Sequence, residues 1–295
     1  MIRSEIDVLS PHTLEDALGL LQQHQNKIRI VAGGSDIIIQ LRDGVVKTEK
    51  LLNLIPVKDL KFIEKRNNEI HIGSLSTYTE IIQSQLIKKG AWVLREAARQ
   101  IGAVQLQNTA TIGGNLGNAS PAADSLPPLF ALGATIVTRN MSGRREIPIE
   151  KFFSGYRRTA LKPDELIEEM YFDRLKKNDA ASYLKLGLRK ANAISIVDVA
   201  VTLRRKVNDS YGDIRVALGA VAPTIVRSHS CEQALKDMSL SEKLLKEAAK
   251  LASKDVSPIT DIRGSAEYRR KVVSSLVYQA LHRAVRGQVG SGSDR

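Results

Sequence analysis

The sequence contains a single cysteine, Cys231, among 295 residues. One cysteine cannot form an internal disulfide, and it cannot provide the set of thiolates that a structural zinc ion or an iron–sulfur cluster requires. The five histidines lie far apart, with no pair at the i,i+4 spacing, so we expect no metal site on them. Any iron–sulfur cluster that works with this protein is therefore expected on another chain.

Long apolar runs and aromatic residues are also scarce. No run approaches the roughly 18 apolar residues of a membrane-spanning helix. The N-terminus lacks the layout of a secretory signal, so we interpret the protein as cytoplasmic. Aromatic residues make up 4% of the chain and no nucleic-acid-binding motif is present, so the net charge of +12 does not indicate DNA or RNA. The charge fits polyanions or acidic protein surfaces as partners.

The spacing of apolar residues predicts a mixed α+β fold rather than a regular βαβ repeat. Short strand-like runs alternate with helices in the first part of the chain, and two of these helices begin at capping residues, Thr13 and Thr77. Asn67-Asn68 predicts the turn of a hairpin between runs at 60–63 and 70–72. The charged stretch 173–180 breaks the pattern, and we place a domain boundary after residue 177.

Residues 178–287 are expected to form a second domain of strands followed by helices. The tail, residues 288–295, is glycine-rich and polar and is expected to fray. A hairpin loop is expected at 208–212. The expected strands span 183–188, 194–203 and 214–221, and the expected helices span 232–237, 241–253 and 266–286.

A glycine pair follows the strand-like run at residues 28–31. The segment 32–36 reads AGGSD, and its two glycines allow positive φ and leave backbone N–H groups free for the close approach of a diphosphate. The chain has no Gly-x-Gly-x-x-Gly fingerprint and no Walker lysine motif, so neither a Rossmann site nor a P-loop is predicted. Taken alone, such a turn can be purely structural.

A second glycine-rich segment spans residues 109–124 and reads TATIGGNLGNASPAAD. We expect a loop with many bare amides and small donors, in which Asp124 offers an acceptor for ribose hydroxyls. The alternative is a long turn before a helix that starts near Ser125. Two amide-rich loops about 80 residues apart fit a ligand with a central diphosphate and a nucleoside at one end, which describes a flavin dinucleotide.

Together with the segments 120–125 and 152–159, these two motifs resemble the FAD-binding medium subunits of the molybdenum hydroxylases. That family includes xanthine dehydrogenase and aerobic carbon monoxide dehydrogenase, and the resemblance runs from Ile6 to about Gly287. It implies a FAD-binding domain of the vanillyl-alcohol-oxidase-like (PCMH) type over residues 1–177, with lobes of about 1–55 and 56–177. A C-terminal flavoprotein domain, a three-stranded sheet with a helical bundle, is implied for residues 178–287.

The resemblance also implies which residues contact the cofactor. Asp124 is expected near the ribitol or ribose, Leu161 against the ring system, and Lys185 near the flavin. Tyr156 and Arg157 are expected where an electron acceptor approaches. Main-chain amides are expected to hold the phosphates at Ala32, Gly33, Gly34, Ser35, Asp36, Thr111, Ile112, Gly113, Gly114 and Asn115.

Each of these side chains has a simpler interpretation. Asp124 could cap the following helix, Leu161 could be ordinary core, and Lys185 could be a solvated strand residue. Residues 156–157 could form a structural turn. No catalytic acid, base or nucleophile is expected on this chain.

The resemblance implies a flavoprotein subunit of an oxidoreductase, within a dimer of heterotrimers. A small subunit would carry [2Fe–2S] clusters and a large subunit the molybdopterin-type molybdenum cofactor, while NAD, a quinone, ferredoxin or oxygen accepts the electrons. Alternatives are a stand-alone FAD oxidoreductase of the same fold and a flavin-binding assembly factor. No nucleic acid and no membrane span are expected.

The chain departs from the family pattern at several positions. Gly117 stands where many relatives carry a cysteine, and Gln107 where many carry an arginine. The cysteine-rich insert of the branch with a 4Fe–4S cluster is missing. Ile196 stands where animal xanthine dehydrogenases carry a second flavin-side lysine, which weakens the expectation of NAD as acceptor.

Overall fold

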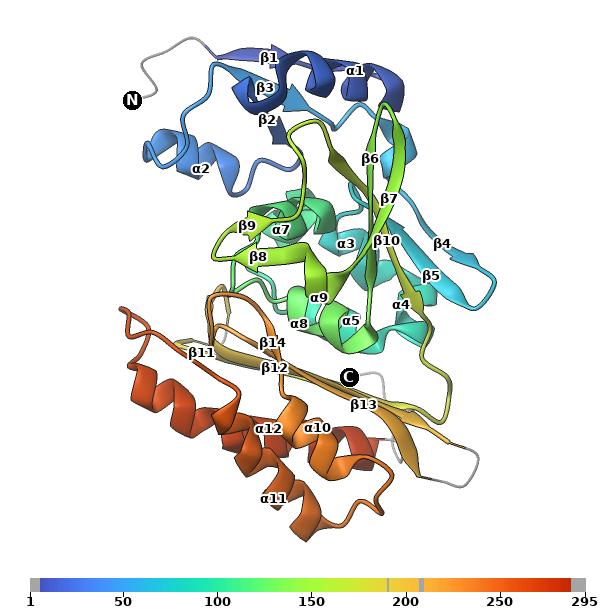
Figure 1. The fold of residues 1–295 in the computed structure, drawn as a ribbon, viewed down its shortest axis with the longest axis vertical. Helices are drawn as coiled ribbons and strands as arrows, with labels where there is room; N and C mark the ends of the chain where they lie inside the picture. Colours follow the sequence, from blue (N-terminus) through green and yellow to red (C-terminus); the bar gives the residue numbers. More distant parts are fainter. Residues whose placement is uncertain (1–5, 190, 207–209, 288–295) are drawn as a thin grey trace.

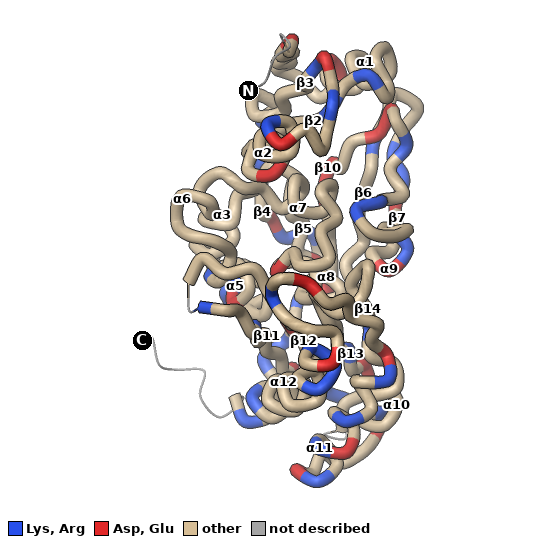
Figure 2. The backbone as a smooth tube through the Cα atoms, turned by 90° about the vertical axis from the view of Figure 1, so that its left-hand side faces the viewer, with Lys and Arg blue, Asp and Glu red and all other residues tan. Residues whose placement is uncertain are grey.

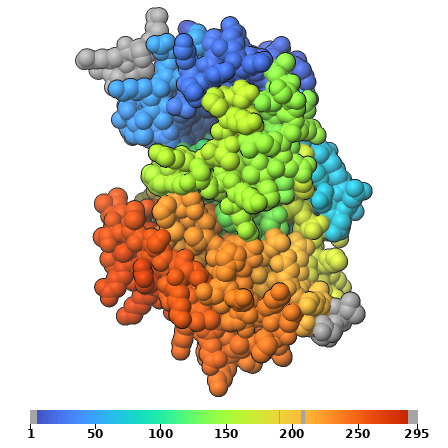
Figure 3. All heavy atoms as spheres, viewed as in Figure 1, coloured from blue at the N-terminus to red at the C-terminus, as the bar shows by residue number. Residues whose placement is uncertain are grey.

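The computed structural model describes residues 6–189, 191–206 and 210–287. Three β-sheets follow one another along the long axis of the molecule (Figure 1). In the space-filling view, the blue N-terminal part lies against the green central part, which in turn lies against the orange C-terminal part (Figure 3). The expected hairpin loop at 208–212 falls partly on residues 207–209, and the expected frayed tail on 288–295, which lie outside the described residues.

The first sheet is parallel, with the strand order β1 (Asp7–Leu9), β3 (Lys50–Asn53), β2 (Ile28–Val31). Helix α1 (Leu14–His24) covers it, and the Thr13 hydroxyl caps that helix by accepting from the Asp16 N–H at 3.1 Å. The apolar face of α1 is buried in a core shared with β3, as its spacing predicts. A 3-10 turn η1 (Gln25–Lys27) leads into β2, and helix α2 (Ile37–Arg42) follows the first glycine segment.

The second sheet is antiparallel, and its central strand β10 comes from late in the chain. The expected hairpin turn forms, with Asn67 at a φ of 53°. The first strand of the hairpin was placed too early at 60–63, because residues 58–60 form a 3-10 turn and the strand spans Ile63–Arg66. The Thr77–Glu80 capping box is present at α3. The strand order is β4 (Ile63–Arg66), β5 (Glu69–Gly73), β10 (Leu166–Asp173), β6 (Thr135–Asn140), β7 (Gly143–Pro148).

Short helices surround this second sheet and fill the connection between β5 and β6. A small hairpin, β8 (Phe153–Gly155) with β9 (Arg158–Thr159), follows β7 and the one-turn helix α9 (Ile149–Phe152). The 3-10 turn η2 (Lys58–Leu60) precedes β4. The six helices between β5 and β6 are α3 (Tyr78–Gln83), α4 (Gln85–Gly90), α5 (Trp92–Ala98), α6 (Val104–Thr109), α7 (Ile112–Asn118) and α8 (Leu126–Leu132).

The third sheet contains the three predicted strands and a fourth that the sequence did not predict. Strand β14 (Val226–Arg227) pairs with the end of β13, so the expected three-stranded sheet is four-stranded. Two residues are too few to show a strand periodicity, which explains the omission. The other strands are β11 (Ala180–Gly187), β12 (Ser195–Arg205) and β13 (Tyr211–Gly219).

This third sheet is packed between the central part of the molecule and the C-terminal helices. Helices α5 and α8 contact β11, β12 and β13, while α12 contacts β11 and β12 (Figure 1). The C-terminal helices are α10 (His229–Leu235), α11 (Glu242–Leu251) and α12 (Ala266–Gly287), with a 3-10 turn η3 (Ala252–Lys254) between the last two. None of the described helices is long and apolar enough to cross a bilayer.

Candidate functional site

A cleft of about 570 Å³ lies where the first glycine segment faces helix α7. Its walls include Gly33, Gly34, Gly113 and Gly114, so the two glycine segments come together although they are about 80 residues apart. Leu161 and Arg157 line the same cleft. The expectation that the two segments form one site therefore agrees with the geometry.

The first glycine segment is a turn whose backbone donors are unused. The N–H groups of residues 33–37 donate to no acceptor within the described part of the chain. Gly34 has a φ of +71°, which an L side chain adopts only with strain. Gly33 lies so close to the end of α6 that a Cβ would be 1.8 Å from the Thr109 carbonyl oxygen. Half-buried, unpaired amides at a tight turn form a concavity for an anion.

The second glycine segment is not the predicted loop, because residues Ile112–Asn118 form helix α7. The N-cap residue Thr111 has extended backbone angles, and its Oγ1 accepts the Gly114 N–H at 3.1 Å. The Gly113 N–H donates to the Ser74 carbonyl at 2.9 Å, and a Cβ on Gly113 would lie 2.5 Å from the Ser74 Cβ. The glycine therefore allows α7 to pack directly on the end of β5.

The remaining amides at the start of α7 are also paired. The Ile112 N–H donates to the Ser76 carbonyl and the Asn115 N–H to the Thr111 carbonyl, both at 3.0 Å. The four main-chain donors from Ile112 to Asn115 are thus occupied in this structure. The residues of this segment that line the cleft are Thr111, Gly113, Gly114, Asn115, Gly117 and Asn118.

A side-chain bridge joins the two sides of the cleft. Asp36 Oδ1 accepts from Asn118 Nδ2 at 2.8 Å, and Gln40 Nε2 donates to Asn118 Oδ1 at 2.8 Å. Gln40 was not among the residues that the sequence singled out, since glutamine on a short helix carries no recognisable motif. The bridge ties α2 to the end of α7 and holds the cleft at a defined width.

Leu161, Arg157 and Tyr156 lie at or near the other wall of the cleft. Leu161 is half-buried and packs against the central core while it lines the cleft, so it is both core and wall. Arg157 adopts a φ of +52° at the tip of the β8–β9 hairpin. Tyr156 is 60% exposed and does not line the cleft, and its ring centroid lies 5.8 Å from the Arg157 guanidinium carbon.

Asp124 and Lys185 form a buried ion pair away from this cleft. Lys185 Nζ lies 2.5 Å from Asp124 Oδ2 and 3.0 Å from the Gln100 carbonyl oxygen, and neither side chain is solvated. Ser195 Oγ donates to Asp124 Oδ1 at 2.6 Å. Burial raises the pKa of Asp124, and the Lys185 ammonium opposes that rise.

These contacts rule out the simpler interpretations of Asp124 as a helix cap and of Lys185 as a solvated residue. Ser125 is the N-cap residue of α8, and the Asp124 carboxylate is held by residues of β11 and β12, so Asp124 is not a helix cap. Lys185 is not a solvated strand residue. It lines a second hollow of about 390 Å³ with Gln100 and residues 186–189, 192 and 193.

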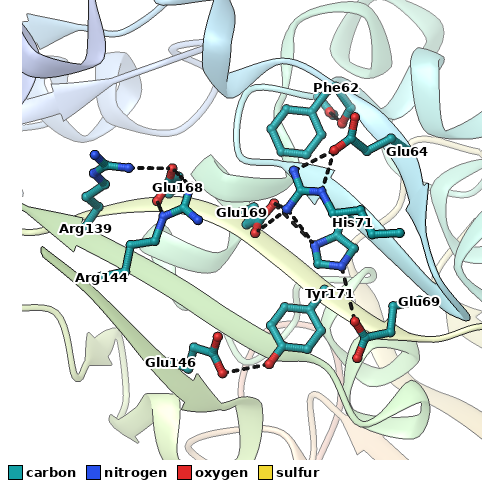
Figure 4. Close-up of polar contacts among 12 residues, drawn as sticks. Phe62, Glu64, Glu69, His71, Arg139, Arg144, Glu146, Glu168, Glu169 and Tyr171 are labelled. Carbon is teal, nitrogen blue, oxygen red and sulfur yellow. Dashed lines mark hydrogen bonds and ion pairs between the residues drawn. The ribbon is translucent and has the colours of Figure 1, made fainter.

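The densest group of charges lies elsewhere, across β4, β5, β10, β6 and β7 (Figure 4). Arg66 donates two hydrogen bonds to Glu169, and His71 Nδ1 lies 3.2 Å from Arg66 Nη1. Arg139 and Arg144 both pair with Glu168. Because these charges are bonded to one another, we interpret the group as a structural network rather than a binding site. Basic and acidic residues are interspersed over the whole chain (Figure 2).

The cleft fits the diphosphate of a dinucleotide better than it fits a metal ion. Among the described residues, no three histidine, cysteine, aspartate or glutamate side chains are placed to hold a metal. The cleft instead offers the unpaired amides of residues 33–37, with the Arg29, Arg157 and Lys162 side chains along its walls. Such donors suit a phosphate group.

Comparison with known proteins gives the same answer over nearly the whole chain. A family model described as the FAD binding domain in molybdopterin dehydrogenase matches residues 4–172. A second, described as the CO dehydrogenase flavoprotein C-terminal domain, matches residues 182–284. The chain is 36% identical over 210 residues to the nicotinate dehydrogenase FAD-subunit of Eubacterium barkeri, which covers 70% of each chain.

Full-length relatives and a solved structure agree. The chain is 30% identical over 281 residues to the glyceraldehyde dehydrogenase medium chain of Sulfolobus acidocaldarius, covering 95% of this chain and 99% of the relative. A structure of carbon monoxide dehydrogenase from Hydrogenophaga pseudoflava, which lacks the Mo-pyranopterin moiety, matches with a TM-score of 0.92 at 27% identity, covering 97% of this chain and 99% of the other. The chain therefore belongs to the family of FAD-binding medium subunits of the molybdenum hydroxylases, and it is a flavoprotein component of an oxidoreductase.

Proposed function

We propose that this chain is the electron-transfer subunit of a heterotrimeric molybdenum hydroxylase. It would receive electrons from [2Fe–2S] clusters on a small subunit, after substrate is oxidised at a molybdenum cofactor on a large subunit. Bound FAD supplies the redox chemistry, and the protein supplies binding, orientation and electrostatics. The observation that carries the proposal is the row of unpaired amides at residues 33–37, in a cleft built on the family's FAD-binding domain.

The two walls of the cleft would hold the diphosphate in different ways. On one side, the N–H groups of Gly33, Gly34, Ser35 and Asp36, and those of the neighbouring residues 32 and 37, would donate to phosphate oxygens. On the other side, the donors left over are the Thr111 N–H, the Thr111 hydroxyl hydrogen and Asn115 Nδ2, which have no acceptor among the described residues. Gly113 and Gly114 would let the ligand approach the backbone of α7 closely.

Asp124, Leu161 and Lys185 would contact the remaining parts of FAD. Leu161 already lines the cleft and would pack against the ring system. Asp124 would accept from ribitol or ribose hydroxyls, and Lys185, held 2.5 Å from it, would place a positive charge near the flavin. Tyr156 and Arg157, at the exposed hairpin tip, would meet the electron acceptor.

The names of relatives support the kind of partner. Two of the relatives are named as medium chains and one as a FAD-subunit, which supports a complex with a smaller and a larger subunit. The complex would be a dimer of heterotrimers. The acceptor would be NAD, a quinone, ferredoxin or oxygen. We place the complex in the cytoplasm, and we place the boundary between the two domains after residue 177.

Expression of this chain alone, and together with candidate small and large subunits, tests the proposal. A yellow chain that binds one FAD but oxidises no substrate by itself, and that purifies with iron and molybdenum when its partners are present, is the expected result. A chain that reduces an acceptor with its own substrate would support the stand-alone oxidoreductase. A chain that stays colourless with excess FAD would contradict the proposal.

A further inference from the structure

A second carboxyl group lies behind the Asp124–Lys185 pair. Asp198, on β12, is completely buried. Its Oδ2 lies 3.0 Å from Tyr183 Oη, and Tyr183 Oη lies 3.4 Å from Asp124 Oδ1. Its other oxygen, Oδ1, has no hydrogen-bond partner among the described residues, and it lies so close to Gly219 that a Cβ there would be 2.1 Å away.

The protons available do not suffice for two carboxylates. Tyr183 has one hydroxyl hydrogen, which can reach either Asp124 or Asp198 but not both at once. Asp124 has two further donors, Lys185 Nζ and Ser195 Oγ. Among the described residues, Asp198 has no side-chain donor besides Tyr183, and only its own backbone N–H adds to it. An ionised Asp198 would therefore be a buried charge with few and neutral donors, which is unfavourable.

We propose that Asp198 is held as the neutral acid and acts as a positioning residue for Asp124. Its proton is donated from Oδ2 to Tyr183 Oη, which leaves the Tyr183 hydrogen to be donated to Asp124 Oδ1. Hydrogen bonds then run from Asp198 to Tyr183 and from Tyr183 to Asp124, and Lys185 and Ser195 also donate to Asp124. The carboxylate of Asp124 is thereby fixed in orientation with one negative charge against one ammonium.

The residues on β11, β13 and α12 agree with this assignment, and Glu96 on α5 accepts the Tyr183 backbone N–H instead of contacting Asp198. Strand β11 contributes Tyr183 and Lys185, and the Lys185 ammonium is already paired with Asp124. Strand β13 contributes only the backbone of Gly219, and beyond it lies the apolar ring of Pro127 on α8. On α12, Arg269 directs its guanidinium to the carbonyls of Ile196 and Ala220 and to Asp261 instead.

The electrostatic directions are consistent with the hydrogen-bond pattern. Burial, and then the neighbouring charge of Asp124, raise the pKa of Asp198 well above its usual range. Burial also raises the pKa of Tyr183 well above 10, so that its hydroxyl stays protonated. Between the two carboxyl groups, Asp124 is the one that keeps its charge, because the ammonium touches it and not Asp198.

The pH dependence of folding stability tests the protonation of Asp198 without any cofactor. A raised pKa in the folded state means that Asp198 stabilises the fold at low pH and that this contribution is lost as pH rises. Between pH 6 and 8, the folded chain would keep a proton that the unfolded chain releases, since an unfolded aspartate has a pKa of roughly 4. The folding equilibrium constant of Asp198→Asn, divided by that of the natural chain, should therefore rise with pH, by up to about tenfold per pH unit while Asp198 stays protonated in the fold.

The control is Asp237→Asn. Asp237 is exposed and paired with Lys206 at 2.5 Å, and this pairing lowers its pKa. Asp237 is ionised in both the folded and the unfolded chain. The folding equilibrium constant of Asp237→Asn, divided by that of the natural chain, should therefore stay constant over the same pH range in urea titrations. A constant ratio for Asp198→Asn as well would show that Asp198 is ionised in the fold, and it would overturn the proposal.

Infrared spectroscopy locates the proton even if Asp198→Asn does not fold. At pH 7, the natural chain labelled with ¹³C at the aspartate carboxyl carbon should show an isotope-sensitive band of a protonated carboxyl group. The band should be absent in Asp198→Asn. Absence of the band from the natural chain, or its unchanged persistence in Asp198→Asn, would contradict the assignment to Asp198.

The positioning role, unlike the protonation, rests on the proposed function, and Tyr183→Phe tests it separately. Removing the hydroxyl should shift the Asp198 band and weaken FAD binding about tenfold, the effect of one lost hydrogen bond to a charged group. A shifted band with unchanged FAD affinity would refute the positioning role. If the natural chain shows the band but binds no FAD at all, the proposed function fails while the neutral Asp198 stands.

Discussion

The two glycine segments look alike in the sequence and differ in the structure. Residues 32–36 form a turn with unpaired N–H groups, whereas residues 112–115 begin a helix in which every N–H is bonded within the chain. The first segment offers hydrogen-bond donors to a ligand, and the second offers space. Glycine therefore serves two purposes in one cleft: a positive φ at Gly34 and close backbone packing at Gly113.

In the charged network on the central sheet, the polar groups are bonded to one another, unlike the N–H groups of residues 33–37. Glu168 and Glu169 are buried, yet arginines bond both of them, and Tyr171 stacks on His71 at 5.0 Å (Figure 4). The charged groups of this network are thus bonded to one another, while the amides of residues 33–37 have no partner among the described residues. Unpaired polar groups, rather than charge density, mark the site.

The largest effect is expected where the two segments touch. In Gly33→Ala, the new Cβ would lie 1.8 Å from the Thr109 carbonyl oxygen, and backbone on both sides must move. We expect a loss of about 3 kcal/mol in the free energy of unfolding, together with loss of bound FAD. Urea titration and the flavin absorbance of the purified protein measure the two effects.

Gly19→Ala is the matched control for that substitution. Gly19 lies in α1, and no atom lies within 4 Å of the position that its Cβ would take. Alanine should stabilise this helix by up to about 1 kcal/mol and leave FAD binding unchanged. If Gly33→Ala behaved like Gly19→Ala, the close contact between the first glycine segment and α6 would be disproved.

A smaller effect, on FAD affinity rather than on stability, is expected from a substitution in helix α7. In Gly114→Val, the Cβ would lie 3.0 Å from Thr111 Oγ1, and its methyl groups would extend into the cleft. We expect FAD affinity to fall about 100-fold, or ~2.7 kcal/mol, while the four-stranded C-terminal sheet stays folded. Equilibrium titration with FAD and circular dichroism distinguish the two outcomes.

Gly19→Val, in helix α1 and outside the cleft, controls for the introduction of a bulky residue in general. No atom lies within 4 Å of the Cβ position at Gly19, so FAD should be retained. Retention of FAD at full stoichiometry by Gly114→Val would count against the placement of the ligand along α7.

The smallest effect is expected from the cap of α7. Thr111→Val keeps the shape of the side chain but leaves the Gly114 N–H without its acceptor, which should cost about 1 kcal/mol of stability. Because the Thr111 hydroxyl is also a proposed donor to phosphate, FAD should bind more weakly as well. Thr13→Val removes the equivalent cap of α1, at 3.1 Å, and should lower stability without changing FAD affinity.

Local features of the fold were predictable from the sequence. The caps at Thr13 and Thr77 and the hairpin at Asn67 depend on neighbouring residues, and all three are present. Helix α7 was not predicted, because three glycines within seven residues oppose a helix by propensity. It is stabilised there by the Thr111 cap and by packing against Ser74, which lies 39 positions before Gly113 in the chain.

In the candidate site too, contacts between residues far apart in the sequence could not be predicted. The sequence identified Asp124 and Lys185, which are 61 residues apart, but it could not show that they bond to each other. It gave no sign of Asp198, whose importance depends on the sheet register that places it beside Lys185 and against Gly219. Residues that act through a long-range contact carry no local pattern, so only the three-dimensional arrangement reveals them.

Amide hydrogen exchange tests the difference between the two glycine segments most directly. Without FAD, the N–H groups of residues 33–37 should exchange rapidly and those of residues 112–115 slowly, because only the latter are hydrogen-bonded in the chain. On addition of FAD, exchange at residues 33–37 should slow markedly, with little change at residues 112–115. Unchanged exchange at residues 33–37 in a chain saturated with FAD would contradict the account.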